Sequence, residues 1–164
     1  MFAEKRKRGR PRIAPEKRFW DRVEKTESCW NWISPINQAG YGQIKVNYKA
    51  IRAHRFSWEL HNGSIPEDKI IDHICHNRRC VNPDHLRVVT HAENMENLSG
   101  PRADNTSGHL GVSFDKRNNR YYAQVIKDGK NHWGGYYETA QEAAAAAKEL
   151  RLQRFTHNIL DRAS

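Results

Sequence analysis

Residues 69–98 read KIIDHICHNRRCVNPDHLRVVTHAENMENL and predict a strand, a loop, a second strand and a helix in close succession. The apolar residues at 70–74 favour a short strand that ends near position 73, and residues 87–89 favour its partner. The pattern Thr-x-x-Glu at 90–93 is typical of a capping box, which predicts a helix that begins at Thr90. This order of elements would bring together three polar residues, namely Asp72, His73 and Asn94.

Residue types that bind metals occupy the loop between the two predicted strands. Cys75, Cys80 and His85 each lie five residues from the next, and Cys29 is the remaining cysteine of the chain. Three thiolates and one imidazole suit tetrahedral zinc, and a closed site of that kind is structural. The alternative is a set of unrelated buried cysteines and an exposed histidine. A chain with a limited core favours zinc, because small modules often need a metal for stability.

The three polar residues of the strands and helix could also support hydrolysis. Asp72 and Asn94 offer the oxygen ligands that Mg²⁺ or another divalent cation prefers. His73, with an ordinary pKa of about 6.5, can take a proton from an attacking water. The cation would stabilise charge on the scissile phosphate and on the leaving 3′ oxygen. The spacing alone equally allows a structural role, in which Asp72 only orients His73.

The residues before position 63 predict further small elements. A short helix is expected over 15–28, followed by alternating apolar and polar residues at 30–32. A turn at 37–40 and a second alternating run at 41–46 predict a hairpin. A helix is expected over 50–61, where Asn62-Gly63 would end it.

The composition excludes two broad classes of protein. No apolar run in the 164 residues approaches the roughly 20 that are needed to span a bilayer. The basic N-terminus has no apolar segment behind it, so it is not a secretory signal, and three cysteines cannot all pair within one chain. We therefore expect a protein of a reducing, cytoplasmic compartment, and neither a membrane protein nor a secreted disulfide scaffold.

Positive charge is concentrated at the two ends of the chain. The chain has 28 Lys and Arg against 19 Asp and Glu, a net charge of +9, and residues 1–18 hold eight basic and two acidic side chains. Residues 19–100 hold ten of each, so a polyanionic partner would contact the flanking regions, although a solvated basic tail would show the same counts. An extended Arg-Gly-Arg-Pro segment can lie in a narrow minor groove. The tail resembles the AT-hook through Arg8, Gly9, Arg10 and Pro11.

Several motifs together resemble the HNH and His-Cys box nucleases, the His-Me finger or ββα-metal endonucleases of phages and mobile introns. The resemblance covers about residues 19–98 and implies a DNA endonuclease, with homing as the favoured role and restriction or another phage task as alternatives. The motifs are Cys29-Trp30-x-Trp32, Gly40-Tyr41-Gly42, Ala53-His54-Arg55, Asp72-His73-x-Cys75 and Cys80-Val81-Asn82-Pro83-x-His85-Leu86, with Asn94 following.

This resemblance implies a role for each matching residue. His73 takes the position of the general base, Asn94 that of the helical ligand to a single divalent metal, and Asp72 that of a second ligand. Asn82 is similar to the middle Asn that braces the loop, and Arg52 or Arg55 is a candidate for the Arg beside the scissile phosphate. The last His of the HNH pattern is replaced by Asn94, which favours one metal ion. The structural zinc set corresponds to Cys29, Cys75, Cys80 and His85.

The C-terminal part predicts a second small module after a linker at 99–107. Strands are expected over 112–114, 121–127 and 131–137, with turns at 117–119 and 128–129. A capping box at 139–142 predicts the Ala-rich helix 140–154. The pattern resembles the Apetala/ethylene-response-factor type of DNA-binding domain at Gly111-Val112, Tyr122-Ala123-Gln124-Val125, Trp133-x-Gly135-Tyr136-Tyr137 and Thr139-Ala140-x-Glu142-Ala143-Ala144.

That second resemblance implies a sheet that enters the major groove. Ser113 and Asp115 stand where the plant proteins have Arg, so the base preference stays open. A sheet used only for packing or for protein contacts is the alternative. The residues expected on the DNA-facing side are Ser113, Arg117, Arg120, Gln124, Asn131 and Trp133.

Taken together, the sequence predicts an α+β endonuclease of double-stranded DNA. A basic tail (1–14) precedes a zinc-stapled ββα-metal core (15–98), a linker (99–107) and a three-stranded antiparallel sheet packed on one helix (108–164). The expected cofactors are structural Zn²⁺ and catalytic Mg²⁺ or another divalent cation, with no small-molecule substrate and no membrane partner. One active site favours nicking by a monomer, while double-strand cutting needs a dimer or two visits. The alternatives are a non-catalytic zinc-containing DNA-binding regulator and a nuclease of broader nucleic-acid specificity.

Overall fold

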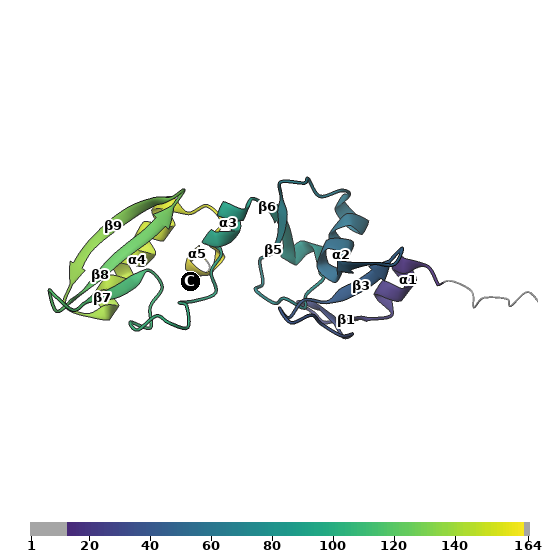
Figure 1. Cartoon of the computed structure of the whole chain (residues 1–164), viewed down its shortest axis with the longest axis horizontal. Helices are drawn as coiled ribbons and strands as arrows, with labels where there is room; N and C mark the ends of the chain where they lie inside the picture. Colours follow the sequence, from purple (N-terminus) through teal and green to yellow (C-terminus); the bar gives the residue numbers. More distant parts are fainter. Residues whose placement is uncertain (1–12, 163–164) are drawn as a thin grey trace, which may run out of the picture. The chain divides into compact units, whose positions relative to one another are not determined.

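The computed structural model describes residues 13–162, which divide into two compact units. The first unit contains the described residues up to Gly63 together with Asn77–His85. The second contains Ser64–His76 and the described residues from Leu86 onward. Figure 1 shows that both units combine short helices with small antiparallel sheets. No helix in the described part of the chain is both long and apolar enough to cross a membrane.

The first unit is built around aromatic side chains. Phe19, Trp32 and Phe56 are buried and pack with Ile44 and Val81, and the Phe19 ring lies 5.2 Å from that of Phe56. Gly42 permits this packing, because a Cβ there would meet the Trp32 ring at 2.5 Å. The elements are α1 (Pro15–Trp20), β1 (Val23–Lys25), β2 (Trp30–Trp32), β3 (Gln43–Val46), β4 (Lys49–Arg52), α2 (Ala53–Asn62) and the 3-10 turn η1 (Pro83–His85).

Three of the predictions for this region are wrong in detail. The helix expected over 15–28 ends at Trp20, and Val23–Lys25 form β1 paired with β2. The strand expected over 41–46 pairs with β4 rather than with residues 30–32, and the turn at Asn47-Tyr48 has positive φ at both residues. A turn of that handedness suits a tight hairpin. Residues 50–52 therefore belong to β4, and α2 begins only at Ala53.

The second unit begins with the strand, strand and helix that the sequence predicts. Strand β5 (Ile70–His73) pairs antiparallel with β6 (Leu86–Val89), and α3 (His91–Glu96) packs against both. Thr90 caps α3 through a complete capping box with Glu93. The mixed architecture, with a helix directly after an antiparallel pair, confirms the predicted fold class and is consistent with a ββα-metal core.

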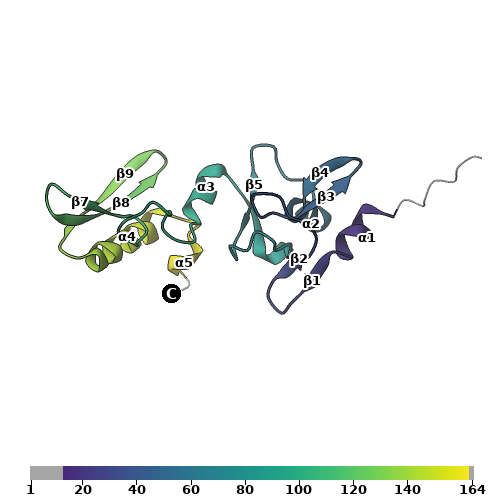
Figure 2. The same cartoon turned by 60° about the horizontal axis from the view of Figure 1, so that its bottom comes forward.

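The remainder of the second unit is a three-stranded sheet with a helix against one face (Figures 1 and 2). Ala123 and Ala147 are fully buried between sheet and helix, and small side chains let the two approach closely. A Cβ at Gly134 would meet the Ala123 Cβ at 2.8 Å, which explains the glycine. The elements are β7 (Val112–Asp115), β8 (Arg120–Lys127), β9 (Lys130–Tyr137), α4 (Ala140–Arg154) and α5 (Ile159–Arg162).

Candidate functional site

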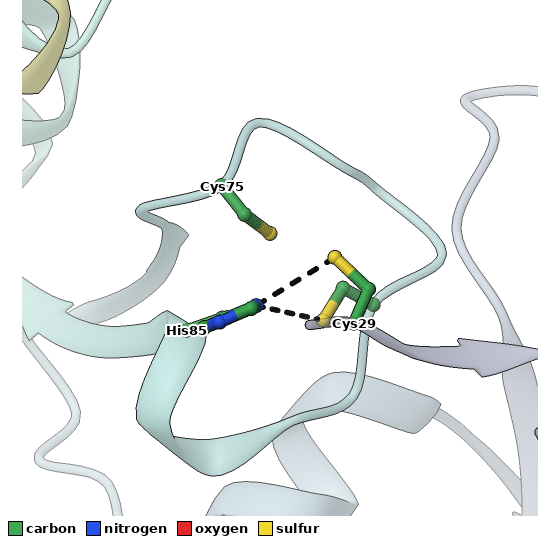
Figure 3. A group of neighbouring side chains, drawn as sticks. Cys29, Cys75 and His85 are labelled. Carbon is green, nitrogen blue, oxygen red and sulfur yellow. Dashed lines mark hydrogen bonds between the residues drawn. The ribbon is translucent and has the colours of Figure 1, made fainter. Parts of the chain in front are cut away.

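The structure brings together all four residues of the predicted zinc set. The ligand atoms of Cys29, Cys75, Cys80 and His85 lie within 4.8 Å of one another. His85 Nδ1 lies 3.6 Å from Cys29 Sγ and 3.7 Å from Cys80 Sγ. Figure 3 shows Cys29, Cys75 and His85 pointing toward a common centre. Tetrahedral zinc with ordinary Zn–S and Zn–N bonds separates sulfur from nitrogen by about 3.6 Å, so this Cys/His cluster could bind zinc.

Backbone and side-chain hydrogen bonds fix the loop that carries Cys80 and His85. Asn82 is buried; its amide donates to the carbonyl of Ser28 at 3.1 Å and accepts from the Asp84 N–H. Val81 N–H donates to the carbonyl of Trp30 on β2 at 2.8 Å. The predicted middle Asn therefore ties the loop to the residue directly before Cys29.

Asp72 is buried in β5, and one of its carboxylate oxygens accepts three hydrogen bonds. Oδ2 accepts two hydrogen bonds from Arg87, at 2.9 Å and 2.8 Å, and one from Asn97 at 3.0 Å. Among the described residues, Oδ1 accepts a single, longer bond of 3.3 Å from Asn97. Arg87 reaches Asp72 because the two residues are direct partners across the β5–β6 pair.

His73 and Asn94 lie on neighbouring elements of this same strand, strand and helix. His73 is buried at the end of β5, and its carbonyl accepts from Asn97 Nδ2 at 3.2 Å. Successive side chains of a strand point to opposite faces, so the His73 imidazole projects from the face opposite to the one that carries the Asp72 carboxylate. Asn94 is half-buried in α3, one helical turn before Asn97. The Asn97 amide thus joins the end of α3 to both Asp72 and His73.

A second buried polar cluster holds the same helix to the C-terminal part of the chain. Glu96 on α3 is buried and pairs with Lys127 of β8. It also accepts from the backbone N–H groups of Thr156 (2.7 Å) and His157 (3.0 Å). We call Glu96, Lys127, Thr156 and His157 the Glu96 cluster. Arg87 joins it to Asp72, because its guanidinium also donates to the His157 carbonyl at 2.7 Å.

The Glu96 cluster shifts the pKa values of its ionic pair. Burial would raise the pKa of Glu96, but hydrogen bonds from Lys127, His157 and Thr156 together outweigh it, so this pKa lies below its usual value. The hydrogen bond to Glu96 in turn raises the pKa of Lys127. Both groups are therefore held in their charged forms at neutral pH.

The two candidate phosphate-contacting arginines lie around the start of α2. Arg52 is exposed at the end of β4, with its guanidinium carbon 5.1 Å from the Tyr41 ring centroid. Arg55 is half-buried in the first turn of α2. The geometry does not distinguish the two candidates. The candidate minor-groove residues of the tail, namely Arg8, Gly9, Arg10 and Pro11, lie outside the described residues.

The residues expected to face DNA lie on the strands and turns of the three-stranded sheet. Gln124 accepts a hydrogen bond from Asn131 Nδ2 at 3.0 Å. Trp133 stacks on Tyr122, with ring centroids 5.3 Å apart. Arg120 forms an exposed ion pair with Glu138 at 3.6 Å. Ser113 is half-buried in β7, and Arg117 is exposed in the turn that follows.

Sequence reasoning missed Arg87, Asn97 and Glu96. The role of Arg87 could have been predicted, because an antiparallel pairing of the two predicted strands places this arginine opposite Asp72. Opposite charges favour such cross-strand positions. Asn97 follows Asn94 by one helical turn, so it shares a face of α3. Glu96 gave no local signal, since its donors come from residues 31 to 61 positions later.

Comparison with known proteins finds one family model and several phage and viral relatives that resemble this chain. Residues 52–96 match the family model of the HNH endonuclease. Protein 3.8 of Escherichia phage T7 is 40% identical over 88 residues, which cover 54% of this chain and 72% of that protein. Protein 7.7 of the same phage is 38% identical over 72 residues, which cover 44% of this chain and 55% of the relative.

A more distant relative extends further along the chain. An uncharacterized HNH endonuclease of Acanthamoeba polyphaga mimivirus is 32% identical over 118 residues, which cover 71% of this chain and 58% of that protein. The chain thus spans little more than half the length of that relative and of Protein 7.7. No solved structure matches the chain.

Proposed function

We propose that this chain, which carries an HNH endonuclease family domain at residues 52–96, hydrolyses phosphodiester bonds in double-stranded DNA with His73 as the general base and a single divalent metal ion. The observation that carries the proposal is the placement of Asp72, His73 and Asn94 on one antiparallel strand pair and the helix that follows it. The favoured biological role is that of a phage homing-type nuclease.

The oxygen atoms around Asp72 fit a hard cation. Asp72 Oδ1 accepts only one long hydrogen bond, and Asn97 Oδ1 is buried without a hydrogen-bond partner in the described part of the chain. Carboxylate and amide oxygens are the ligands that Mg²⁺ prefers. Asp72 and Asn94 would hold the ion, which would supply stabilisation of the charge that develops on the phosphate.

The chain's own residues would carry the proton transfer and the positioning. The His73 imidazole accepts a proton from the attacking water as the water oxygen bonds to phosphorus and the bond from phosphorus to the 3′ oxygen breaks. The released 3′ oxygen then takes a proton from solvent. Arg87 and Asn97 hold the Asp72 carboxylate in place through their hydrogen bonds. Because Asn97 also binds the His73 carbonyl, it fixes the end of β5 from which the imidazole projects.

Separate parts of the chain would hold the DNA and the fold. The Cys/His cluster would bind structural zinc, and Asn82 would brace the loop. Arg52 or Arg55 would contact the scissile phosphate. The sheet β7–β9 and the basic tail, which flank in the sequence a stretch with no net charge, would contact the duplex.

A plasmid assay tests the proposal. Supercoiled DNA that carries the protein's own genomic flank is incubated with the zinc-loaded protein, with and without added Mg²⁺. Relaxed or linear DNA should appear only with Mg²⁺ and should be lost in His73→Ala, a drop of about 100-fold or more. His91→Ala, which removes an exposed histidine of α3, is the matched control and should cut normally.

The same assay separates the rival functions. Tight duplex binding without cleavage in the wild type would indicate the DNA-binding regulator. Cleavage of RNA or single strands as fast as of duplex DNA would indicate the nuclease of broader specificity. If His73→Ala cuts as well as the wild type, the assignment of the base is wrong.

A further inference from the structure

The exposed face of the three-stranded sheet carries two amides and two large apolar side chains side by side. Helix α4 packs against the other face of this sheet. Gln124 is the cross-strand partner of Trp133, and Ile126 is the partner of Asn131, so the four form a square on β8 and β9. We call these four residues the amide patch. Ile126 is 66% exposed and Trp133 is 51% exposed.

The two amides of the patch bind one another and leave a defined pair of groups for a ligand. Asn131 Nδ2 donates to Gln124 Oε1 at 3.0 Å. Gln124 Nε2 and Asn131 Oδ1 take part in no hydrogen bond among the described residues. If both amides were turned over, the pair would still present one donor beside one acceptor. The patch therefore offers one donor and one acceptor at neighbouring positions.

Aromatic neighbours pack around Trp133, one of the two apolar members of the patch. The Trp133 ring stacks on Tyr122 and meets the edge of Tyr136, with centroids 5.3 Å and 5.1 Å away. Tyr136 is in turn fixed by a hydrogen bond to Asp115 at 2.8 Å. An exposed tryptophan that its neighbours hold in one orientation loses little entropy when it binds a partner.

Charge around the patch favours a duplex as the partner. Lys116 and Arg117 are exposed in the turn before β8, and Lys130 is exposed at the start of β9. Arg120, at the start of β8, is paired with Glu138. Cations at the ends of the strands suit phosphates, while uncharged groups at the centre suit base edges.

The base edges that match the patch are those of an A·T pair. In the major groove adenine presents an acceptor (N7) beside a donor (N6), and thymine presents an apolar methyl group. Guanine presents two acceptors and cytosine one donor, so no single base of a G·C pair would satisfy both groups of the amide pair. The usual reader of guanine is a bidentate arginine, and the patch contains none.

We propose that the amide patch recognises A·T base pairs in the major groove, with Gln124 and Asn131 on adenine and Ile126 and Trp133 on the thymine methyl group. This inference rests on the proposed action on double-stranded DNA. Ser113 and Asp115 stand where the plant proteins that the sheet resembles have arginine, which left the base preference of the sheet open. The amide patch would supply such a preference.

Binding by the full-length, zinc-loaded His73→Ala protein without Mg²⁺ tests the inference, because that variant holds DNA without cutting it. Duplexes selected from a random pool should be enriched in A·T pairs. In the best of them, 7-deazaadenine removes the N7 acceptor and should weaken binding about 5- to 10-fold. Uracil in place of thymine removes the methyl group and should weaken binding about 2- to 5-fold.

Variants assign the effect to the patch. Adding Gln124→Ala or Asn131→Ala should abolish the response to 7-deazaadenine and lower affinity for the selected duplex about 5- to 100-fold. Gln141→Ala, which removes an exposed amide of α4, is the matched control and should keep both the affinity and the response. Circular dichroism of each variant verifies that the sheet is folded.

The outcomes separate this inference from the proposed function. A wild-type protein that cuts duplex DNA but binds 7-deazaadenine and adenine equally overturns the A·T assignment and leaves the nuclease standing. An A·T preference without that response would come from the minor groove, and it too overturns the role of the patch. A protein that neither binds nor cuts duplex DNA fails both proposals.

Discussion

The Cys/His cluster and the Glu96 cluster both gather polar side chains from distant parts of the sequence, yet they differ in what can stabilise them. In the first, three thiols and an imidazole converge within 4.8 Å, an arrangement that could bind a shared zinc ion. In the second, a buried carboxylate receives its donors from the chain itself, through Lys127 and two backbone N–H groups. The first should therefore respond to metal supply, and the second to pH and to substitution.

The largest effect should come from removing zinc. A structural zinc site contributes folding free energy directly, about 10–16 kcal/mol in small zinc peptides. Chelation should therefore abolish the cooperative melting of the core that Trp30 and Trp32 report, since β2 directly follows Cys29. Tryptophan fluorescence during heating, together with zinc content by mass spectrometry, measures this.

Substitutions show whether the loss reflects the cluster itself. Cys80→Ala should bind no zinc and melt like the chelated protein. His76→Ala lies in the same loop but outside the cluster, so it should keep one zinc per chain. Unchanged melting after complete zinc removal would contradict a structural role for the Cys/His cluster.

The next largest effect should come from Glu96→Gln. The amide keeps the size of the side chain but leaves Lys127 without its negative partner, and breaking such a pair costs about 3 kcal/mol. Urea unfolding at pH 7 should show this loss of unfolding free energy, with zinc content unchanged. Glu149→Gln, an exposed change on α4, should alter stability by less than about 0.5 kcal/mol. An equal effect of the two substitutions would mean that the Glu96 cluster adds no special stability.

The pH dependence of the unfolding free energy tests the Glu96 cluster further. The pKa of Glu96 is lowered in the folded protein from its ordinary 4.5, so the unfolded chain takes up this proton first as the pH falls. The stability that Glu96 adds is therefore fully present above about pH 4.5 and is lost as the pH falls through the folded pKa. The difference in unfolding free energy between wild type and Glu96→Gln should be constant from pH 7 to 5 and shrink below 4.5. A difference that persists to pH 3 would contradict this assignment.

The elements that the sequence predicts well are those with local signals. The helix expected over 140–154 has these bounds in the structure, because Thr139 and Glu142 mark its start and Phe155 leaves the helical conformation. The start of α3 follows from Thr90 and Glu93 in the same way. Residues 23–25 were expected in a helix, but pairing with β2 determines their structure, and no local pattern encodes that partner.

The residues of the candidate site also differ in whether local sequence signals could predict them. Regular spacing in one loop allowed the Cys/His cluster to be predicted, including Cys29, which lies far from it in sequence. Asp72 could be placed on its strand, but the hydrogen bonds from Arg87 and Asn97 depend on strand register and on the end of α3. The donors to Glu96 come from β8 and from the residues after α4, so only the folded chain brings them to α3.

The smallest effect tests whether α3 serves stability and cleavage separately. Thr90→Ala and Thr139→Ala each remove a capping-box side chain and should each lower the unfolding free energy by about 1 kcal/mol. Only α3 carries Asn94, so Thr90→Ala should also slow single-turnover cleavage several-fold at saturating Mg²⁺, whereas Thr139→Ala should not. Equal cleavage rates in the two variants would show that fraying of the first turn does not reach Asn94. In that case the Glu96 cluster, which holds the other end of α3, would be sufficient to position this residue.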